Sequence, residues 1–272
     1  MKTFFLKVNF IFIFLIFAFI SNISNSKEAQ AELLKPNWSF DGFFGTFDRA
    51  SLQRGFQVYK EVCASCHSMS LVSYRNLGEK GGPEFTEEEV KAIASQYEVT
   101  DGPNAQGEMF IRPGRPSDKF KSPYPNENAS RSANGGAYPP DMSVLAKARP
   151  GGADYIYSVL MGYEEKVPEN IKLEDGVYYN KYMSGNKIRM SKPLSDGSVE
   201  YSDGTKASEE QMAKDVTSFM MWAAEPHLEV RKKLGFKSVL YLLILTILVY
   251  LIKKKIWSVL NLKCKISPSL TK

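Results

Sequence analysis

Two cysteines and a histidine lie within five consecutive residues, Cys63-Ala64-Ser65-Cys66-His67. This spacing is typical of covalent haem attachment, because each thiol adds to one haem vinyl group and the adjacent imidazole binds the iron. A Cys-x-x-Cys pair also occurs in zinc ribbons and in thioredoxin-like dithiols. The chain has only three cysteines and two histidines, so no second Cys-x-x-Cys or histidine pair exists to complete a tetrahedral zinc site. The motif therefore predicts one covalent haem c, with thioethers on Cys63 and Cys66 and with His67 on the iron.

A low-spin electron carrier needs a second strong iron ligand, and the sequence favours a methionine. The other histidine, His227, follows the last soluble helix and is expected on the surface near a membrane. Thioether ligation also raises the reduction potential, which suits a late-stage carrier. Among ten methionines, Met190 lies in a turn-rich loop braced by Pro193 and is the predicted ligand. Met142, directly after Pro139-Pro140-Asp141, is the alternative.

The N-terminus has the pattern of an export signal. Lys2 and Lys7 precede an apolar run over residues 8–20, and the small-residue site Ala29-Gln30-Ala31 follows it. This pattern predicts a signal peptide over residues 1–31 that is cleaved after Ala31, with an uncleaved anchor as the alternative. The following domain, residues 32–233, is then exported.

A second apolar run covers residues 236–252 and ends at three consecutive lysines, residues 253–255. As a helix this run is about 25 Å long, and the flanking lysines can extend to the membrane surface. It predicts one transmembrane helix over residues 234–255. A buried core helix is the alternative, but a lysine cluster directly after it would be costly in a core. The lysine-rich tail, residues 256–272, is expected on the cytoplasmic or matrix side.

The charge of the exported domain differs from that of the whole chain. The whole chain carries a formal net charge of +5, whereas residues 32–233 hold 25 Lys and Arg against 29 Asp and Glu, a net charge of −4. An acidic redox domain attracts a basic protein partner and makes the encounter sensitive to salt. Nucleic acid is not an expected partner.

Helical patterns at both ends of the exported domain predict a mainly α fold. Asp48 caps a helix over residues 49–62 that leads into the haem motif, and Thr86 opens a second helix with a capping box. A third helix is expected over residues 154–163, and a fourth runs from a capping box at residues 208–211 to Pro226. The first and last of these are expected to pack together, as in c-type cytochrome domains.

Long loop insertions separate the predicted helices. Residues 101–140 contain seven prolines and are expected to form no helix but to wrap around the haem. Residues 164–206 are expected to form turns, with a small hairpin across the Ser-Asp-Gly turns at residues 195–198 and 202–205.

Six segments of the chain resemble the cytochrome c1 family: RGFQVYKEVCASCHSM (54–69), DGPN (101–104), GEMFIRPG (107–114), PPD (139–141), GGADY (151–155) and WAAEPH (222–227). Cytochrome c1 is the haem subunit of the cytochrome bc1 complex. The resemblance implies that this chain works beside cytochrome b, takes an electron from the Rieske iron–sulfur protein and passes it to soluble cytochrome c. The export signal and the anchor predict a single-pass location in the cell inner membrane with the haem domain on the periplasmic side; an organellar inner membrane is the alternative.

The resemblance also assigns individual residues. It implies axial ligation by His67 and Met190, and haem-pocket contacts from Asn134, Pro140, Arg149 and Tyr155, of which Arg149 neutralises a haem propionate. The loop around Met190 departs from the family pattern, because Lys187, Arg189 and Lys192 replace small apolar residues and proline. Unsolvated positive charges near the iron would raise the potential. Two other functions remain open from the residues: a free-standing membrane-anchored cytochrome that feeds a terminal oxidase, and a haem-free thiol–disulfide module.

Overall fold

The computed structural model describes residues 31–169 and 171–266, with the side chains of residues 259–266 left out. The predicted signal peptide therefore lies outside the described residues except for Ala31. The described residues from Leu33 onward belong to one compact unit, and its regular elements are mainly helices. The mainly α prediction is confirmed.

Helix α2, Arg49–Glu61, begins where the sequence predicted and ends directly before the Cys-x-x-Cys-His motif. Asp48 caps it, since its Oδ1 accepts a hydrogen bond from the Ala50 amide at 3.1 Å. Leu52, Phe56 and Tyr59 lie on one helix face and are buried. The packing of this face fixes the point where the motif leaves the helix.

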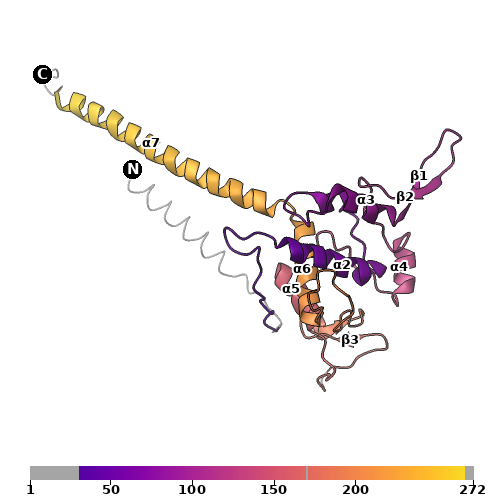
Figure 1. Ribbon diagram of the computed structural model, residues 1–272. Coiled ribbons are helices and arrows are strands. Elements are labelled where there is room, and N and C mark those ends of the chain that lie inside the picture. The colour runs from indigo at the N-terminus through magenta and orange to yellow at the C-terminus, as the bar shows by residue number, and fades with distance from the viewer. Residues whose placement is uncertain (1–30, 170, 267–272) are drawn as a thin grey trace, which may run out of the picture. The chain divides into compact units, whose positions relative to one another are not determined.

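Helix α6, Glu209–Ala224, packs against α2 and forms the centre of the core (Figure 1). The ring of Phe219 lies 5.7 Å from Phe56 and 5.9 Å from Tyr59 between centroids. The backbones approach closely at Gly55, where an added Cβ would lie 2.1 Å from the Asp215 carbonyl oxygen. The predicted pairing of the first and last soluble helices is confirmed.

Asp215 of α6 is completely buried and binds α2 through charged hydrogen bonds. Its carboxylate accepts from Ser51 Oγ at 2.7 Å and from Arg54 Nε at 2.8 Å. Gln211 Nε2 donates to the same carboxylate at 3.0 Å. The capping box predicted at Ser208 is therefore only half formed: Ser208 Oγ accepts from the Gln211 amide, but the Gln211 side chain binds Asp215 instead.

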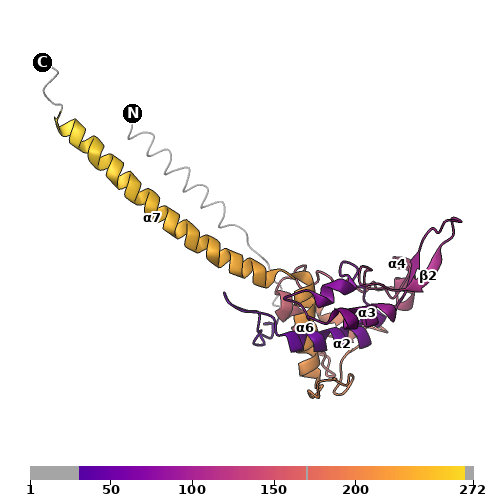
Figure 2. The same ribbon diagram turned by 45° about the horizontal axis from the view of Figure 1, so that its top comes forward.

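Two further helices accompany this pair: α3, Glu87–Ser95, lies beside α2 in both views (Figure 1 and Figure 2), and α5, Gly152–Met161, packs against α6. Helix α3 has the full capping box predicted at Thr86, with Glu89 as the reciprocal partner. Helix α5 begins two residues before the predicted start at Asp154, after Gly151 at φ +90°. A left-handed glycine allows the sharp entry into this helix.

The long loops contain more structure than predicted. Helix α4, Glu127–Ala133, lies inside the segment for which the sequence predicted no helix, and that prediction is wrong. Asn126 Oδ1 caps it by accepting from the Ala129 amide at 2.9 Å, and Arg131 pairs with Glu127 at 2.6 Å. One capped turn with an i, i+4 ion pair is enough for a short helix between prolines.

Two small antiparallel ladders complete the described fold. Strand β1, Glu98–Asp101, pairs with β2, Phe110–Pro113, and strand β3, Tyr178–Tyr179, pairs with β4, Lys187–Ile188. Short 3₁₀ helices are η1, Cys63–Ser65, η2, Tyr74–Gly78, and η3, Ser184–Asn186. The hairpin predicted across residues 195–205 is wrong in position, because both turns form there without a strand among the described residues.

Helix α7, Leu228–Ile266, contains the whole predicted transmembrane segment 234–255. Its stretch Leu228–Ser258 is long and apolar enough to cross a membrane. The apolar side chains of residues 239–252 are exposed rather than packed in the core. Exposure of a continuous apolar helix surface is typical of a lipid-facing helix and disfavours the buried core helix. His227 is exposed just before this helix, as predicted.

Candidate haem site

The thiol pair lies in one tight turn at the end of α2. The carbonyl oxygen of Cys63 accepts hydrogen bonds from the Cys66 amide at 3.1 Å and from the His67 amide at 2.9 Å. Both cysteines are free and partly buried. The turn thus holds two thiols and an imidazole next to one another at the edge of the core, and this donor set fits covalent haem c.

His67 is oriented by a carbonyl group from a segment far away in the sequence. Its Nδ1 lies 2.9 Å from the carbonyl oxygen of Pro140. A carbonyl only accepts, so Nδ1 carries the proton and the Nε2 lone pair is left for a metal. Burial, the largest influence, lowers the pKa of His67 against the opposing effects of Pro140 and Asp141. A neutral imidazole with a hydrogen-bonded Nδ1 is the form that binds iron.

A carboxylate that the sequence analysis missed holds this carbonyl in place. Asp141 Oδ2 accepts from Ser68 Oγ at 2.8 Å and from the Ser70 amide at 2.8 Å. Its other oxygen accepts from the Ser143 amide at 2.8 Å. Burial acts to raise the pKa of Asp141, but these hydrogen bonds outweigh it and lower the pKa to about 2. Two features of the sequence pointed to this carboxylate: the serine-rich stretch beside His67 and the PPD segment at residues 139–141.

The thiol of Cys63 is unsuited to disulfide exchange. Burial raises its pKa to about 12, with a smaller contribution from Cys66. A thioredoxin-like dithiol instead needs a lowered pKa at the first cysteine, since the thiolate is the nucleophile. The site therefore disfavours the thiol–disulfide module.

Met142 lies behind His67, in the segment that bears the Pro140 carbonyl. Its amide donates to the Ser68 carbonyl at 2.8 Å, and its side chain is only 8% exposed in the hydrophobic core. Because Nδ1 and Nε2 lie on opposite sides of the imidazole ring, this segment lies on the side away from Nε2, the atom that would bind the iron. Its position favours a packing role for Met142.

Met190 is half-buried in a separate loop that follows β4. Its carbonyl oxygen accepts from Tyr163 Oη at 3.0 Å, and the neighbouring Arg189 donates to the Gly135 carbonyl at 3.3 Å. Arg189 also lies 3.8 Å from Glu174, and Lys192 pairs with Glu209 at 2.7 Å. Two of the three basic residues around Met190 are thus paired with acids, so their field is weaker than the sequence alone indicates.

The remaining predicted pocket residues lie on α4 and α5. Asn134 caps the end of α4 and donates through Nδ2 to the Ser130 carbonyl at 2.7 Å. Tyr155 is half-buried on α5, and its hydroxyl donates to the sulfur of Met183 at 3.2 Å. Burial raises the pKa of Tyr155, and the exposed Arg149 nearby opposes the rise. Tyr155 and Arg149 therefore share one side of the domain.

The structure thus brings the predicted residues together in three groups. Pro140 contacts His67 beside the two cysteines, Asn134 neighbours the Met190 loop through Gly135, and Arg149 lies close to Tyr155. Within residues 31–169 and 171–266, no hydrogen bond joins Met190, Asn134 or Arg149 directly to the Cys63–His67 turn.

A mainly helical domain whose first helix leads into a Cys-x-x-Cys-His turn, with a carbonyl behind the histidine, defines a c-type haem domain. The Cytochrome C1 family model matches residues 38–260. The chain belongs to the cytochrome c1 family.

Relatives occur in bacteria and in mitochondria. The chain is 50% identical over 260 residues to a "Cytochrome b/c1" of Bradyrhizobium diazoefficiens, covering 88% of this chain but only 38% of that protein. It is 44% identical over 253 residues to a "Cytochrome c1" of Rhodospirillum rubrum, covering 88% and 92% of the two chains. It is 50% identical over 243 residues to a "Cytochrome c1-2, heme protein, mitochondrial" of Solanum tuberosum, covering 89% and 92%.

Proposed function

We propose that this chain is the membrane-anchored monohaem subunit of a quinol–cytochrome c oxidoreductase of the cytochrome bc1 type. In this proposal it accepts an electron from the Rieske iron–sulfur protein, lies beside cytochrome b, and passes the electron to soluble cytochrome c. The observation that carries the proposal is the match to the cytochrome c1 family over residues 38–260, which includes the haem motif and most of α7.

The roles of the residues follow from their positions. Bound haem c supplies a centre that takes up and releases one electron. Cys63 and Cys66 fix this group covalently to the end of α2, and His67 is held in its neutral, Nδ1-protonated form by Pro140. Asp141 holds the Pro140 segment in place, and Met190 would supply a thioether sulfur as the second iron ligand beside His67. Asn134 and Tyr155 line the pocket, and Arg149 offers its positive charge to a propionate.

The location proposed for the chain follows from the export signal near its N-terminus and from the apolar helix near its C-terminus. Residues 1–31 form a cleaved signal peptide, residues 32–233 the exported haem domain, residues 234–255 the membrane anchor and residues 256–272 an inner-side tail. The haem domain then faces the periplasm from the cell inner membrane. A single apolar helix within Leu228–Ser258 supports this arrangement.

Purification of the full chain from its own membranes tests the proposal. The haem absorption should survive acid–acetone extraction, because thioether-bound haem is not extracted, and b-type haem and the Rieske protein should purify with the chain. Loss of all haem on extraction would overturn the haem assignment and favour the dithiol module. Covalent haem without b-type haem or a Rieske protein would favour the free-standing cytochrome.

A further inference from the structure

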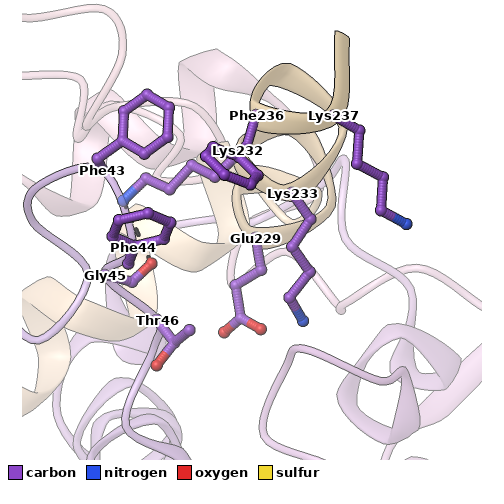
Figure 3. A pocket seen from close by; sticks show the side chains of 9 residues that line it. All are labelled: Phe43, Phe44, Gly45, Thr46, Glu229, Lys232, Lys233, Phe236 and Lys237. Carbon is purple, nitrogen blue, oxygen red and sulfur yellow. Dashed lines mark hydrogen bonds between the residues drawn. The ribbon is translucent and has the colours of Figure 1, made fainter. Parts of the chain in front are cut away.

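A cluster of exposed phenylalanines lies where the haem domain meets α7. Phe43, Phe44 and Phe236 are 58%, 76% and 47% exposed. Their ring centroids lie 5.1 to 6.1 Å apart, so the three rings form one continuous apolar surface. We call these residues the phenylalanine cluster (Figure 3). Large apolar side chains gathered on a surface indicate a binding site rather than chance exposure.

The loop that carries two of these rings is held firmly to the first turns of α7. Lys232 Nζ donates to the carbonyl oxygens of Phe40 at 2.5 Å and Gly45 at 3.2 Å. Glu229 accepts from the Phe47 amide at 3.0 Å. The loop is thus fixed by hydrogen bonds at both ends while Phe43 and Phe44 stay outside the core.

The tight turn of this loop requires glycine at position 45. At Gly45 an added Cβ would lie 1.9 Å from the carbonyl oxygen of Asp41. No other residue fits there without moving the backbone. The exposed rings are therefore presented by a built turn and not by a flexible segment.

The position of the cluster along α7 identifies its surroundings. Phe236 is the first residue of the apolar run, and the helix from Leu228 to Ser258 is long enough to span a bilayer. If α7 crosses the membrane, Phe236 lies at the boundary between headgroups and acyl chains, and the loop fixed to it lies at the same depth. Phenylalanine rings beside basic side chains insert at this boundary in membrane-surface segments.

Two lysines beside the cluster supply the matching charge. Lys233 and Lys237 are exposed and are separated by one helical turn, so they extend on the same side of α7 (Figure 3). A hollow of about 190 Å³ lies between these lysines and the rings, which is smaller than a typical cofactor pocket of roughly 300 Å³ or more. Lysine ammonium groups over an apolar surface match a lipid, with its phosphate at the lysines and its acyl chains at the rings.

We infer that the phenylalanine cluster, with Lys233 and Lys237, is a membrane-embedded wedge that binds an anionic phospholipid on the haem-domain side of the bilayer. The wedge fixes the haem domain at one height and tilt above the membrane. This inference rests on the proposed membrane anchor.

Spin labelling of the full, haem-loaded chain tests the wedge. A label is placed at Phe44→Cys in a Cys264→Ser background, since Cys63 and Cys66 are occupied by haem, and the chain is reconstituted in phosphatidylcholine nanodiscs. The measured quantity is the oxygen preference, the rate of collisions of the label with oxygen divided by the rate of collisions with a water-soluble nickel chelate. Because oxygen concentrates in lipid, the oxygen preference at position 44 should exceed severalfold that of a control label at Glu88→Cys, which is exposed on α3.

Lipid charge provides the second measurement. Replacing half of the phosphatidylcholine by phosphatidylglycerol should raise the oxygen preference at position 44 further. In the double variant Lys233→Gln/Lys237→Gln, phosphatidylglycerol should no longer raise the oxygen preference at position 44. The oxygen preference in pure phosphatidylcholine should stay unchanged. Lys166→Gln/Lys172→Gln, an equal loss of charge at exposed lysines of the haem domain, should keep the rise.

Three results would overturn the inference. The label at position 44 could behave like the label at position 88, which would place the loop in water. It could be shielded only in the whole purified complex and not in nanodiscs, which would make the occupant another subunit. Failure of the chain to join the nanodiscs at all would overturn the membrane anchor, and this inference with it.

Discussion

Met190 and Met142 are the two candidate sulfur ligands of the haem iron, and they lie in different segments of the structure. Met142 lies behind His67 in the core, whereas Met190 is half-buried in a loop of its own. We expect Met190→Leu to leave the haem covalently attached but to lower its reduction potential by on the order of 0.1 V or more, because axial ligands set haem potentials over a wide range. Spectroscopic redox titration measures this.

Two variants serve as controls for the ligand. Met142→Leu conserves volume and should leave the potential nearly unchanged, at a cost in stability of less than about 1.5 kcal/mol. Arg189→Gln removes a charge already close to Glu174 and should shift the potential far less than Met190→Leu. A potential that stays constant in Met190→Leu and falls in Met142→Leu would reverse the assignment.

The lowered pKa of Asp141 predicts how the free energy of unfolding changes with pH. Its pKa is lowered from an ordinary value of 3.8 to about 2 by its hydrogen bonds to Ser143 and Ser70, which outweigh burial. A carboxylate with a lowered pKa stabilises the fold above its unfolded pKa and loses this effect as the pH falls through the folded value. Asp141→Asn should cost about 1–3 kcal/mol at pH 7.

The difference between Asp141→Asn and the parent chain should shrink as the pH falls from about 4 towards 2. Denaturant unfolding of the haem-loaded chain, followed at several pH values, measures it. Asp175→Asn, at an exposed aspartate, is the matched control and should change stability little at any pH. A difference that stays constant down to pH 2 would mean that Asp141 acts through shape and not through charge.

At the scale of helices, Gly55 determines how closely α2 and α6 approach. A Cβ at this position would lie 2.1 Å from the backbone of Asp215, so Gly55→Ala must push the helices apart. We expect a loss of roughly 1–3 kcal/mol, since overpacking forces backbone shifts. Thermal unfolding should show it. Gly235→Ala, where a Cβ meets nothing within 4 Å, should be neutral or slightly stabilising and is the control.

Local signals account for the elements that the sequence predicted well. Asp48, Thr86 and Ser208 bind the first amides of α2, α3 and α6, and capping depends on neighbouring residues alone. Helix α4 was missed because proline content outweighed a cap at Asn126. The hairpin predicted across residues 195–205 does not form, because Ser-Asp-Gly turns predict the turns themselves and not the pairing of the segments beside them.

Contacts between segments far apart in the chain account for the features of the haem site that the sequence could not predict. The bond from His67 to Pro140 joins residues 73 positions apart, and the bonds from Ser68 and Ser70 to Asp141 depend on the same loop crossing. No periodicity or cap predicts such a crossing. The spacing alone predicts that His67 binds the iron, whereas the tautomer of His67 and the positioning role of Asp141 could be inferred only from the fold.

At the scale of the whole molecule, the net charge of residues 32–233 predicts how salt affects the encounter with a charged partner. Residues 32–233 carry 29 acidic against 25 basic side chains, and haem propionates add further negative charge. The rate at which the purified complex reduces a basic soluble cytochrome c should therefore fall as salt rises, because the Debye length shortens from about 30 Å at 0.01 M to about 8 Å at 0.15 M.

An anionic small-molecule oxidant is the control for this prediction, because its rate of reduction should change with salt in the opposite direction. It is repelled by the same field, so its reduction should become faster as salt screens the repulsion. Stopped-flow measurements of both acceptors, at equal pH and over the same salt series, compare the two slopes. Opposite slopes support electrostatic steering by the acidic haem domain. A flat response with the basic partner would mean that local contacts at the docking face, and not the net charge of the domain, control the encounter.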